Sequence, residues 1–269
     1  MDGNLFRKPG INLIIDFWKS VRNQLEDNSK PADSVEKKMD GQTLDSNSDL
    51  DDATDRVFCI SMQRTGTTSV GRFFRDFGFR WAGWPADEKN NWSSSWYEGD
   101  FEAIFSSPDF RAANAFEDSP WFCPDFYKVL FNRFPNAKFI LFTRDPDAWF
   151  QSMVNHSGGD VIGTTRGHCK TYRRELEYFD LLHSGELDEE IENQIHSEKK
   201  LKIVGHDKHY KEIYRLHNTE VQDFFRRHNP GKLHVGRLED PDKWEKLGKF
   251  LSIEVPDHYE SYENRSISK

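Results

Sequence analysis

Short apolar runs alternate along this chain with segments whose apolar residues recur every three or four positions. Residues 57–60 and 139–142 are continuous apolar runs, which are typical of strands buried on both faces of a parallel sheet. Residues 233–235 form a third, weaker strand candidate. The pattern therefore predicts short buried strands separated by helices.

Helical patterns follow the two stronger strand candidates. After the first strand, an apolar face with i, i+3, i+4, i+7 spacing consists of Val70, Phe73, Phe74 and Phe77. A second helix is predicted to begin near Pro124. After the second strand, Asp145 and Pro146 have the residue types favoured at the cap and first turn of a helix.

Further helices are predicted in the second half of the chain. Residues 172–200 are charged and helical in pattern, and residues 210–225 form a longer amphipathic helix. Asp240 and Pro241 predict the start of a last helix. Strands alternating with helices predict an α/β fold, with a mainly parallel sheet covered by helices on both faces, as in P-loop NTPases.

The first 55 residues differ from the rest in composition. A weak amphipathic helix is predicted within residues 1–25, and residues 28–55 are rich in Ser, Asp, Asn and Lys. Such a segment buries too little apolar surface to offset the entropy of ordering, so we expect a flexible acidic linker. The sequence thus predicts an N-terminal extension, 1–55, and one domain, 56–269.

Charge and cysteine content narrow the class of protein. A net charge of −9 argues against a nucleic-acid-binding protein, which needs a basic face. The three cysteines have neither disulfide nor zinc-site spacing, so we expect reduced thiols, no metal and a cytoplasmic location. Asn12 and Asp16 interrupt the apolar stretch 11–18, and we expect no membrane span.

The segment 61–69 links the first strand to its helix and has the character of an anion-binding loop. Backbone N–H groups at a helix N-terminus attract anions, and Gly66 lets the chain wrap closely around one. Arg64 adds a permanent cation, and the hydroxyls of Thr67, Thr68 and Ser69 add hydrogen bonds. The alternative is a polar turn without a ligand.

The loop departs from the nucleotide-kinase pattern. A Walker loop reads G-x-x-x-x-G-K-[ST], but Ser61 stands at its first glycine and Thr67 at its lysine. The cation lies instead at Arg64, before the second glycine. This difference favours a less charged, metal-free group over a nucleoside triphosphate.

A second candidate segment follows the strand 139–142. Arg144 stands at the carboxyl end of this strand, and Ser152 follows eight positions later on the predicted helix. Ligands of open α/β sheets bind beyond the carboxyl ends of strands, so Arg144 and the 61–69 loop are expected at one rim. The alternative is that Arg144 pairs with Asp145 or Asp147 and that Ser152 is an ordinary helix residue.

Together these two segments resemble the sulfotransferases that use 3′-phosphoadenosine-5′-phosphosulfate (PAPS). Their phosphosulfate loop is usually P-K-S-G-T-T, and R-T-G-T-T variants are typical of a bacterial-type branch. The strand–Arg–Ser segment resembles the family's 3′-phosphate site, and residues 244–251 resemble a C-terminal helix of that branch. The donor-binding residues that the resemblance implies are Gln63, Arg64, Thr65, Gly66, Thr67, Thr68, Ser69, Arg144 and Ser152.

The resemblance also implies catalytic residues. Arg64 replaces the family's usual lysine and is assigned to the leaving-group oxygens. Many members have a histidine base in a T-H-x-P segment, where this chain has Asp118, with Glu117 beside it. A carboxylate is a weak base unless its pKa is raised, and Asp118 has the alternative role of capping a turn.

The expected reaction is sulfuryl transfer from PAPS to a hydroxyl or amine of a small-molecule, sugar or lipid acceptor. An aromatic-rich stretch between the two segments is either the acceptor pocket or buried core; it contains Trp81, Trp84, Trp92, Trp96, Tyr97, Phe101, Phe105, Trp121 and Phe122. A P-loop small-molecule kinase and a non-catalytic nucleotide-binding protein are the competing hypotheses.

Overall fold

The computed structural model describes residues 55–187 and 201–261. Within them, five parallel strands form one sheet in the order β2-β3-β1-β4-β5. The strands are β1 (Val57–Cys59), β2 (Trp81–Ala82), β3 (Ala115–Phe116), β4 (Lys138–Thr143) and β5 (Leu233–Arg237). Neighbouring strands are distant in sequence, because each parallel pairing requires a crossover connection.

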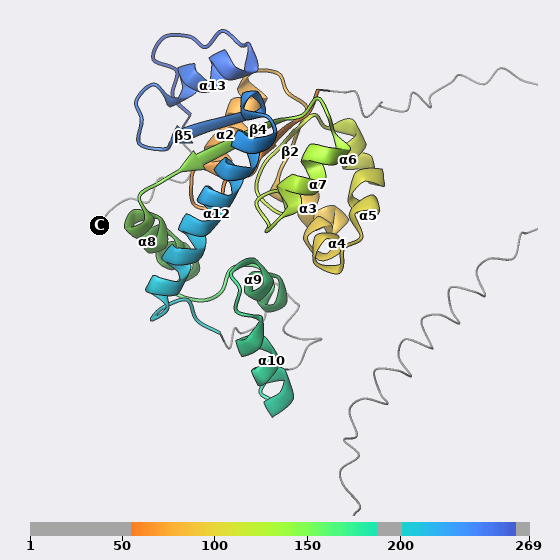
Figure 1. The fold of residues 1–269 in the computed structure, drawn as a ribbon, viewed down its shortest axis with the longest axis vertical. Coiled ribbons are helices and arrows are strands. Elements are labelled where there is room, and N and C mark those ends of the chain that lie inside the picture. Colours follow the sequence, from red (N-terminus) through yellow and green to blue (C-terminus); the bar gives the residue numbers. More distant parts are fainter. Residues whose placement is uncertain (1–54, 188–200, 262–269) are drawn as a thin grey trace, which may run out of the picture. The chain divides into compact units, whose positions relative to one another are not determined.

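Helices cover both faces of the sheet (Figure 1). Those between β1 and β4 are α2 (Thr67–Asp76), α3 (Trp84–Asn90), α4 (Trp92–Glu98), α5 (Phe101–Ser106), α6 (Pro108–Ala112) and α7 (Phe126–Arg133). After β4 come α8 (Pro146–Ser157), α9 (Thr165–Thr171), α10 (Glu175–Ser184), α12 (Asp207–His228), a 3₁₀ turn at Pro230–Lys232, and α13 (Lys243–Leu251).

The alternation of side chains along the strands creates two separate cores. Phe139 and Leu141 of β4 belong to a large cluster that includes side chains of α7, α8 and α12. Ile140 and Phe142 point to the other face, into a smaller cluster with side chains of α2 and α13. Because β4 is buried on both faces, its sequence is a continuous apolar run.

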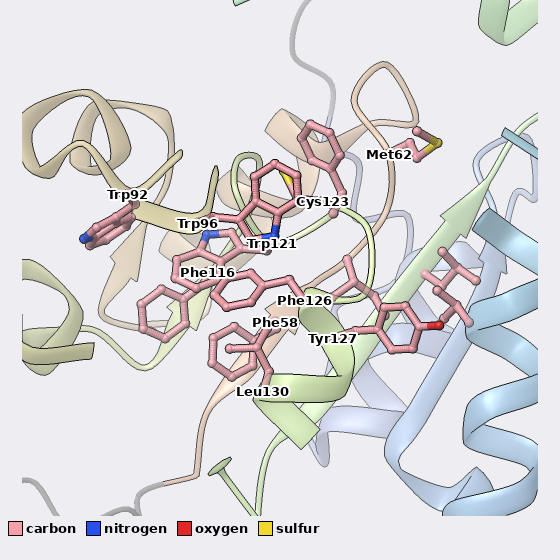
Figure 2. Close-up of a cluster of buried hydrophobic side chains, with 14 of the residues drawn as sticks. Phe58, Met62, Trp92, Trp96, Phe116, Trp121, Cys123, Phe126, Tyr127 and Leu130 are labelled. Carbon is pink, nitrogen blue, oxygen red and sulfur yellow. The ribbon is translucent and has the colours of Figure 1, made fainter. Parts of the chain in front are cut away.

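Aromatic rings dominate the larger core, part of which is shown in Figure 2. The Phe58 ring centroid lies 4.9 Å from that of Phe116 and 5.3 Å from that of Trp121, and all three side chains are fully buried. Trp121 in turn contacts the rings of Trp92 and Phe126. This packing fixes the segment that follows β3 against the centre of the sheet.

The predicted α/β fold, with its parallel sheet and helices on both faces, is confirmed. The three predicted strands are present, but the two-residue strands β2 and β3 and the short helices α3 to α6 were not predicted. The last helix begins at Lys243 rather than at Asp240–Pro241, because a turn closed by Lys243 N–H and the Asp240 carbonyl precedes it.

Some predictions fall on parts of the chain that the structure does not describe. The N-terminal helix and linker lie outside the described residues, as does the end of the segment 172–200. Across residues 55–187 and 201–261, no helix combines the length and the apolar character that a membrane span requires.

Candidate active site at the carboxyl ends of β1 and β4

The loop between β1 and α2 presents backbone N–H groups at its helix end. Gly66 is the N-cap residue of α2, and no side chain caps the first turn. Gly66 has φ +88°, and Arg64 has φ +68°, a conformation that usually costs a non-glycine residue about 1–2 kcal/mol. The loop thus has the tight curvature and free helix terminus expected of an anion-binding turn.

Two aromatic residues connect this loop to the end of β4. The Trp149 indole Nε1 donates to the Gln63 carbonyl at 2.9 Å, and its ring stacks on Tyr214 with centroids 4.3 Å apart. The Tyr214 hydroxyl accepts from the Arg144 N–H at 2.7 Å and donates to the Arg144 carbonyl at 3.2 Å. Side chains of α8 and α12 thereby hold both predicted segments at one rim.

The side chains of the two predicted segments also meet. Arg64 Nε donates to Ser152 Oγ at 3.2 Å, and Arg144 Nη1 approaches the Arg64 carbonyl at 3.5 Å. Arg144 lies 4.0 Å from a Glu239 carboxylate oxygen, and this ion pair is at the limit of contact. The side chain of Arg144 therefore points toward the loop.

The alternative partners for Arg144 are otherwise engaged. The Asp145 carboxylate accepts from the N–H groups of Asp147 and Ala148 and caps α8. The Asp147 carboxylate pairs with Lys211 at 2.6 Å. The first turn of α8 thus uses its acidic residues for capping and for a contact with α12.

The guanidinium groups of Arg64 and Arg144 are close enough for their like charges to repel each other. Burial lowers the pKa of Arg64, the charge of Arg144 lowers it further, and Asp118 acts in the opposite direction. An oxyanion placed between the two arginines would relieve their repulsion and accept charge-assisted hydrogen bonds from both. The residues present therefore fit a phosphorylated ligand.

A cavity of about 770 Å³ opens beside this rim. Gln63, Arg64, Thr67 and Thr68 line its loop side. The other lining residues come from within the segments 84–98 and 162–172, from the segment that begins at Asp118, and from His156. Its volume lies in the range of about 300–1,000 Å³ that is usual for sites of drug-sized ligands.

Asp118 lines the same cavity as Arg64. It has φ +70° and accepts the Ser119 N–H at 2.9 Å, so it forms a local turn. Burial raises the pKa of its carboxyl, which hydrogen bonds from Ser119 and the charge of Arg64 oppose. The cavity is thus lined by a carboxyl whose pKa is raised and by a guanidinium whose charge acts on that carboxyl.

Comparison with known proteins identifies the family. The sulfotransferase domain family matches residues 56–266. The chain belongs to the sulfotransferase family. No curated protein matches it. A similar solved structure is the crystal structure of a sulfotransferase from Alicyclobacillus acidocaldarius, 15% identical, with 78% of this chain and 87% of that chain covered and a TM-score of 0.44. The chain is thus a sulfotransferase, an enzyme that transfers a sulfuryl group.

The second carboxylate that the sequence suggested in this sulfotransferase lies elsewhere. Glu117 is 3% exposed and is not among the residues that line the cavity. Its Oε1 occupies space beside Gly71 and Gly83, where an added Cβ would lie 3.0 and 2.3 Å from it. The two glycines therefore make room for Glu117 beneath the cavity wall.

Three further predicted residues, Thr65 and Ser69 of the loop and Ser152 of α8, are not among the residues that line the cavity of the sulfotransferase. The Thr65 hydroxyl donates to the Met62 carbonyl at 2.6 Å, and Thr65 is fully buried. Ser69 is also buried, and its carbonyl accepts from the Ser261 hydroxyl. Ser152 is 6% exposed and lies behind Arg64. The loop side of the cavity is thus formed by Gln63, Arg64, Thr67 and Thr68. Thr65, Ser69 and Ser152 support these residues from behind.

The aromatic stretch of the sulfotransferase divides between pocket and core. The side chains that line the cavity are those of Trp84, Trp96, Tyr97 and Phe122. Trp96 and Phe122 also belong to the buried cluster. Trp92, Phe105 and Trp121 belong to that cluster without lining the cavity, and Trp81 packs on the opposite core. Part of this aromatic stretch therefore lines the cavity, and part of it is buried core.

Several residues of the site were not found from the sequence. His156 and several residues of the segment 162–172 line the cavity, and burial and Arg64 lower the pKa of His156. His156 follows Ser152 by one helical turn, a spacing that places both on one face of α8. His168 also lines the cavity, but its Nε2 lies 2.8 Å from the Tyr210 hydroxyl. Its ring is thus held by the fold.

The three cysteines carry free thiols, a group that could bind a metal ion. Cys59, Cys123 and Cys169 are all buried free thiols, and burial raises their pKa values. Cys123 lines the cavity with its Sγ 3.9 Å from the Thr171 hydroxyl. Among the described residues, no three His, Cys, Asp or Glu side chains are grouped as metal ligands.

Proposed function

We propose that this sulfotransferase uses PAPS as its donor and transfers the sulfuryl group to a hydroxyl or amine of a small-molecule acceptor bound in the cavity. The observation that carries the proposal is the meeting of Arg64, Ser152 and Arg144 at one rim. Two cations beside an uncapped helix terminus suit a ligand with two separate anionic groups.

The two ends of the donor correspond to the two segments. The N–H groups of the first turn of α2, with the Thr67 and Thr68 hydroxyls, would bind the 5′-phosphosulfate. Arg144 and Ser152 would bind the 3′-phosphate, since Ser152 can exchange its bond to Arg64 for one to a phosphate oxygen. The whole set from Gln63 to Ser69 would then act as one cradle, with Thr65 and Ser69 beneath it.

Arg64 is the group that would stabilise charge on the leaving side. A guanidinium stays protonated at neutral pH even where burial lowers its pKa, so Arg64 acts through electrostatics and hydrogen bonding without giving up a proton. Bound PAPS supplies the sulfuryl group: a bond forms between sulfur and the acceptor oxygen or nitrogen as the sulfur–oxygen bond to the phosphate breaks, and 3′,5′-diphosphoadenosine leaves with the electron pair.

Asp118 is the group that would receive the acceptor's proton. Its position on the wall of the cavity that Arg64 also lines and its raised pKa support this role. Glu117 would instead act from beneath the wall, as a positioning residue for the segment that carries Asp118. A positioned base contributes typically about 10²- to 10⁴-fold in rate.

Ligand-induced stabilisation tests the donor assignment. A ligand at about 100 times its Kd stabilises a protein by roughly 2.7 kcal/mol. We expect 3′,5′-diphosphoadenosine to raise Tm without magnesium and ATP with magnesium to raise it little. The opposite order would favour a small-molecule kinase.

Transfer of label tests the reaction itself. Incubation with ³⁵S-labelled PAPS and an acceptor library should produce a labelled product, and Arg64→Ala should reduce its rate of formation by about 10²- to 10³-fold. Donor binding without transfer to any acceptor would favour a non-catalytic nucleotide-binding protein.

A further inference from the structure

A second carboxyl, that of Asp87, lines the cavity together with Asp118. Asp87 lies on α3, which follows β2, and Asp118 comes shortly after β3. β2 and β3 are adjacent parallel strands, and the Glu117 N–H extends their pairing by donating to the Ala82 carbonyl at 3.3 Å. The carboxyl ends of these two strands therefore bring both aspartates to the same part of the cavity wall.

Asp87 is held in place by the first turn of α4. It is 2% exposed, and its two carboxylate oxygens accept from the Ser93 N–H at 2.7 Å and from the Ser93 hydroxyl at 2.6 Å. A carboxyl so buried and so fixed has little surface for a direct contact with an acceptor. Its influence on a reaction must therefore pass through a neighbouring group of the wall.

The Ser119 side chain connects the two aspartates. Burial is the main cause that raises the pKa of each carboxyl, to about 6 for Asp87, and hydrogen bonding by the Ser119 side chain opposes the rise in both. Ser119 lines the cavity as the two aspartates do, and its N–H donates to Asp118 Oδ1 at 2.9 Å. The Ser119 hydroxyl thus lies within hydrogen-bonding reach of both carboxyls.

A single hydroxyl cannot serve two ionised carboxyls equally. A serine hydroxyl has one proton to donate and two lone pairs that accept. While both carboxyls are ionised, Ser119 can donate to only one of them, and the two negative charges repel each other. Once Asp118 is protonated, its O–H can donate to Ser119 Oγ while the Ser119 hydroxyl donates to Asp87. The chain of three groups is therefore complete only after Asp118 has taken up a proton.

Several titratable groups surround this pair of aspartates. Three of them stay uncharged at neutral pH because burial raises their pKa values; these are Cys59, Cys123 and Tyr172. The Glu117 carboxyl occupies the space beside Gly71 and Gly83. Glu88, next to Asp87 on α3, is exposed at the rim of the cavity.

Two neighbouring charges act on Asp118 in opposite directions. Against the effect of burial, the charge of Arg64 lowers the pKa of Asp118. The charge of Asp118 raises the pKa of Asp87, and by reciprocity an ionised Asp87 raises that of Asp118. Lys170 of α9 is engaged elsewhere, because it donates to the Tyr97 carbonyl at 2.7 Å. Asp87 thus makes Asp118 a stronger base in spite of Arg64.

We propose that Asp87 is a positioning residue for the transfer step, which acts through the Ser119 hydroxyl to favour movement of the acceptor's proton to Asp118. This inference rests on the proposed function and deepens it. As the bond between sulfur and the acceptor forms, the acceptor's proton moves to Asp118, and 3′,5′-diphosphoadenosine leaves with the electron pair of the sulfur–oxygen bond that breaks. Ser119 keeps its own proton while it donates to Asp87, so no proton is transferred to Asp87.

Carbon-13 NMR of the carboxyl groups tests the coupling without any ligand. Protein that contains aspartate with ¹³C at the side-chain carboxyl is titrated with acid, and the Asp118 signal is the one that Asp118→Asn removes. We expect Asp87→Asn to lower the pH midpoint of this signal by about one unit, and to lower it less in a Ser119→Ala background. An unchanged midpoint in Asp87→Asn would overturn the inference.

Two control variants accompany the titration. Asp109→Asn removes an acid that pairs with Lys89 of α3 at 2.8 Å and does not line the cavity, and it should leave the Asp118 midpoint unchanged. Ser119→Thr keeps the hydroxyl, so Asp87→Asn should have its full effect in that background. An equal effect of Asp87→Asn in the Ser119→Ala and Ser119→Thr backgrounds would show that the hydroxyl does not connect the aspartates, which contradicts the proposal.

Kinetics connect the coupling to turnover. The acceptor is 4-methylphenol, or the compound of the acceptor library that gives most product, with saturating ³⁵S-labelled PAPS. Asp87→Asn should lower kcat by about threefold to tenfold above pH 7 and should move the acid limb of the kcat profile to lower pH by about one unit, with KM for the acceptor unchanged. A lower kcat with the acid limb in its wild-type place would indicate a purely structural role and would overturn the inference.

The failure of this inference and that of the proposed function are distinguishable. If transfer occurs but neither the Asp118 midpoint nor the acid limb responds to Asp87→Asn, the sulfotransferase mechanism stands and the role of Asp87 is wrong. If the midpoint shifts but no compound is sulfated, the aspartates are coupled without a catalytic role, and the proposed function fails as well.

Discussion

The Nε of Arg64 donates a hydrogen bond to Oγ of Ser152, which lies 88 positions further along the chain. One residue comes from the loop after β1 and the other from the helix after β4. Because β1 and β4 are adjacent parallel strands, their carboxyl ends bring these side chains together. The contact joins the two segments that the sequence suggested separately.

Replacement of Arg64 should affect catalysis more than folding. Arg64→Ala is expected to lower kcat/KM by about 10²- to 10³-fold, the usual cost of losing one preorganised donor to developing negative charge. Arg64→Lys should retain more activity, but that activity should fall above about pH 10 as the lysine deprotonates. Arg72→Ala, on the exposed face of α2, is the control in the same transfer assay.

Arg144 should determine selectivity for the 3′-phosphate. We expect wild-type protein to bind 3′,5′-diphosphoadenosine more tightly than AMP, and Arg144→Ala to weaken the first by about 10- to 100-fold, since a hydrogen bond to a charged group contributes about 1.5–3 kcal/mol. Isothermal titration with both nucleotides measures this. Arg226→Ala, an exposed arginine on α12, should change neither affinity. An equal loss for both nucleotides would contradict the assignment.

Asp118→Asn should lower the activity without lowering the stability of the fold. The variant is expected to lose about 10²- to 10⁴-fold in kcat, and the wild-type rate should fall as pH drops through a pKa above the ordinary value of about 3.9. Because burial raises the pKa of Asp118, its ionised form disfavours the folded state, and the amide should not lower Tm. Asp125→Asn, at an exposed position that also has a positive φ, is the control.

Tyr214→Phe should loosen the end of β4. The hydroxyl bonds both backbone groups of Arg144, and its loss leaves them without this partner, which costs roughly 1–3 kcal/mol in the free energy of unfolding. The buried Tyr127 hydroxyl has no hydrogen-bond partner in the described residues, so Tyr127→Phe is a matched control. Urea unfolding of both variants provides the comparison; equal effects would argue against the clamp.

Asp87 should make stability depend on pH in the acid range. Burial raises the pKa of its carboxyl to about 6, while hydrogen bonds from Ser93 act in the opposite direction. The unfolded value is about 4, so the stabilisation by the protonated carboxyl declines between about pH 4 and 6, by roughly 3 kcal/mol. Asp87→Asn should flatten this decline in urea titrations, because the amide can still bond Ser93. An unaltered pH profile would show that Asp87 is not its source.

The parts of the fold that the sequence predicted are those with strong local signals. β4 is a continuous apolar run because it is buried on both faces, and α8 has an aspartate cap followed by proline. By contrast, β2 and β3 are two residues long, too short for any periodicity to show. The helices α3 to α6 have five to seven residues each and were equally hidden.

In the candidate site, too, the sequence predicted the placement of those residues that have a strong local signal. The residues near Gly66 and Arg144 follow strands directly, so topology alone placed them at one rim. The contribution of Trp149 and Tyr214 depends on how α8 and α12 pack, and no local pattern reveals it. Likewise, Trp84 and Trp92 look alike in sequence, and only tertiary packing assigns one to the cavity and the other to the core.

Leu238 closes over the loop from the far end of the chain. A Cβ added at Gly66 would lie 2.6 Å from the Cδ1 of Leu238. The N–H of Leu238 donates to the Thr143 carbonyl at the end of β4. During synthesis, residues 63–69 leave the ribosome long before Leu238 does. The turn can therefore acquire its final surroundings only after β5 and Leu238 have been translated, and a nascent chain stalled before β5 would carry the entire segment 63–69 without a finished site.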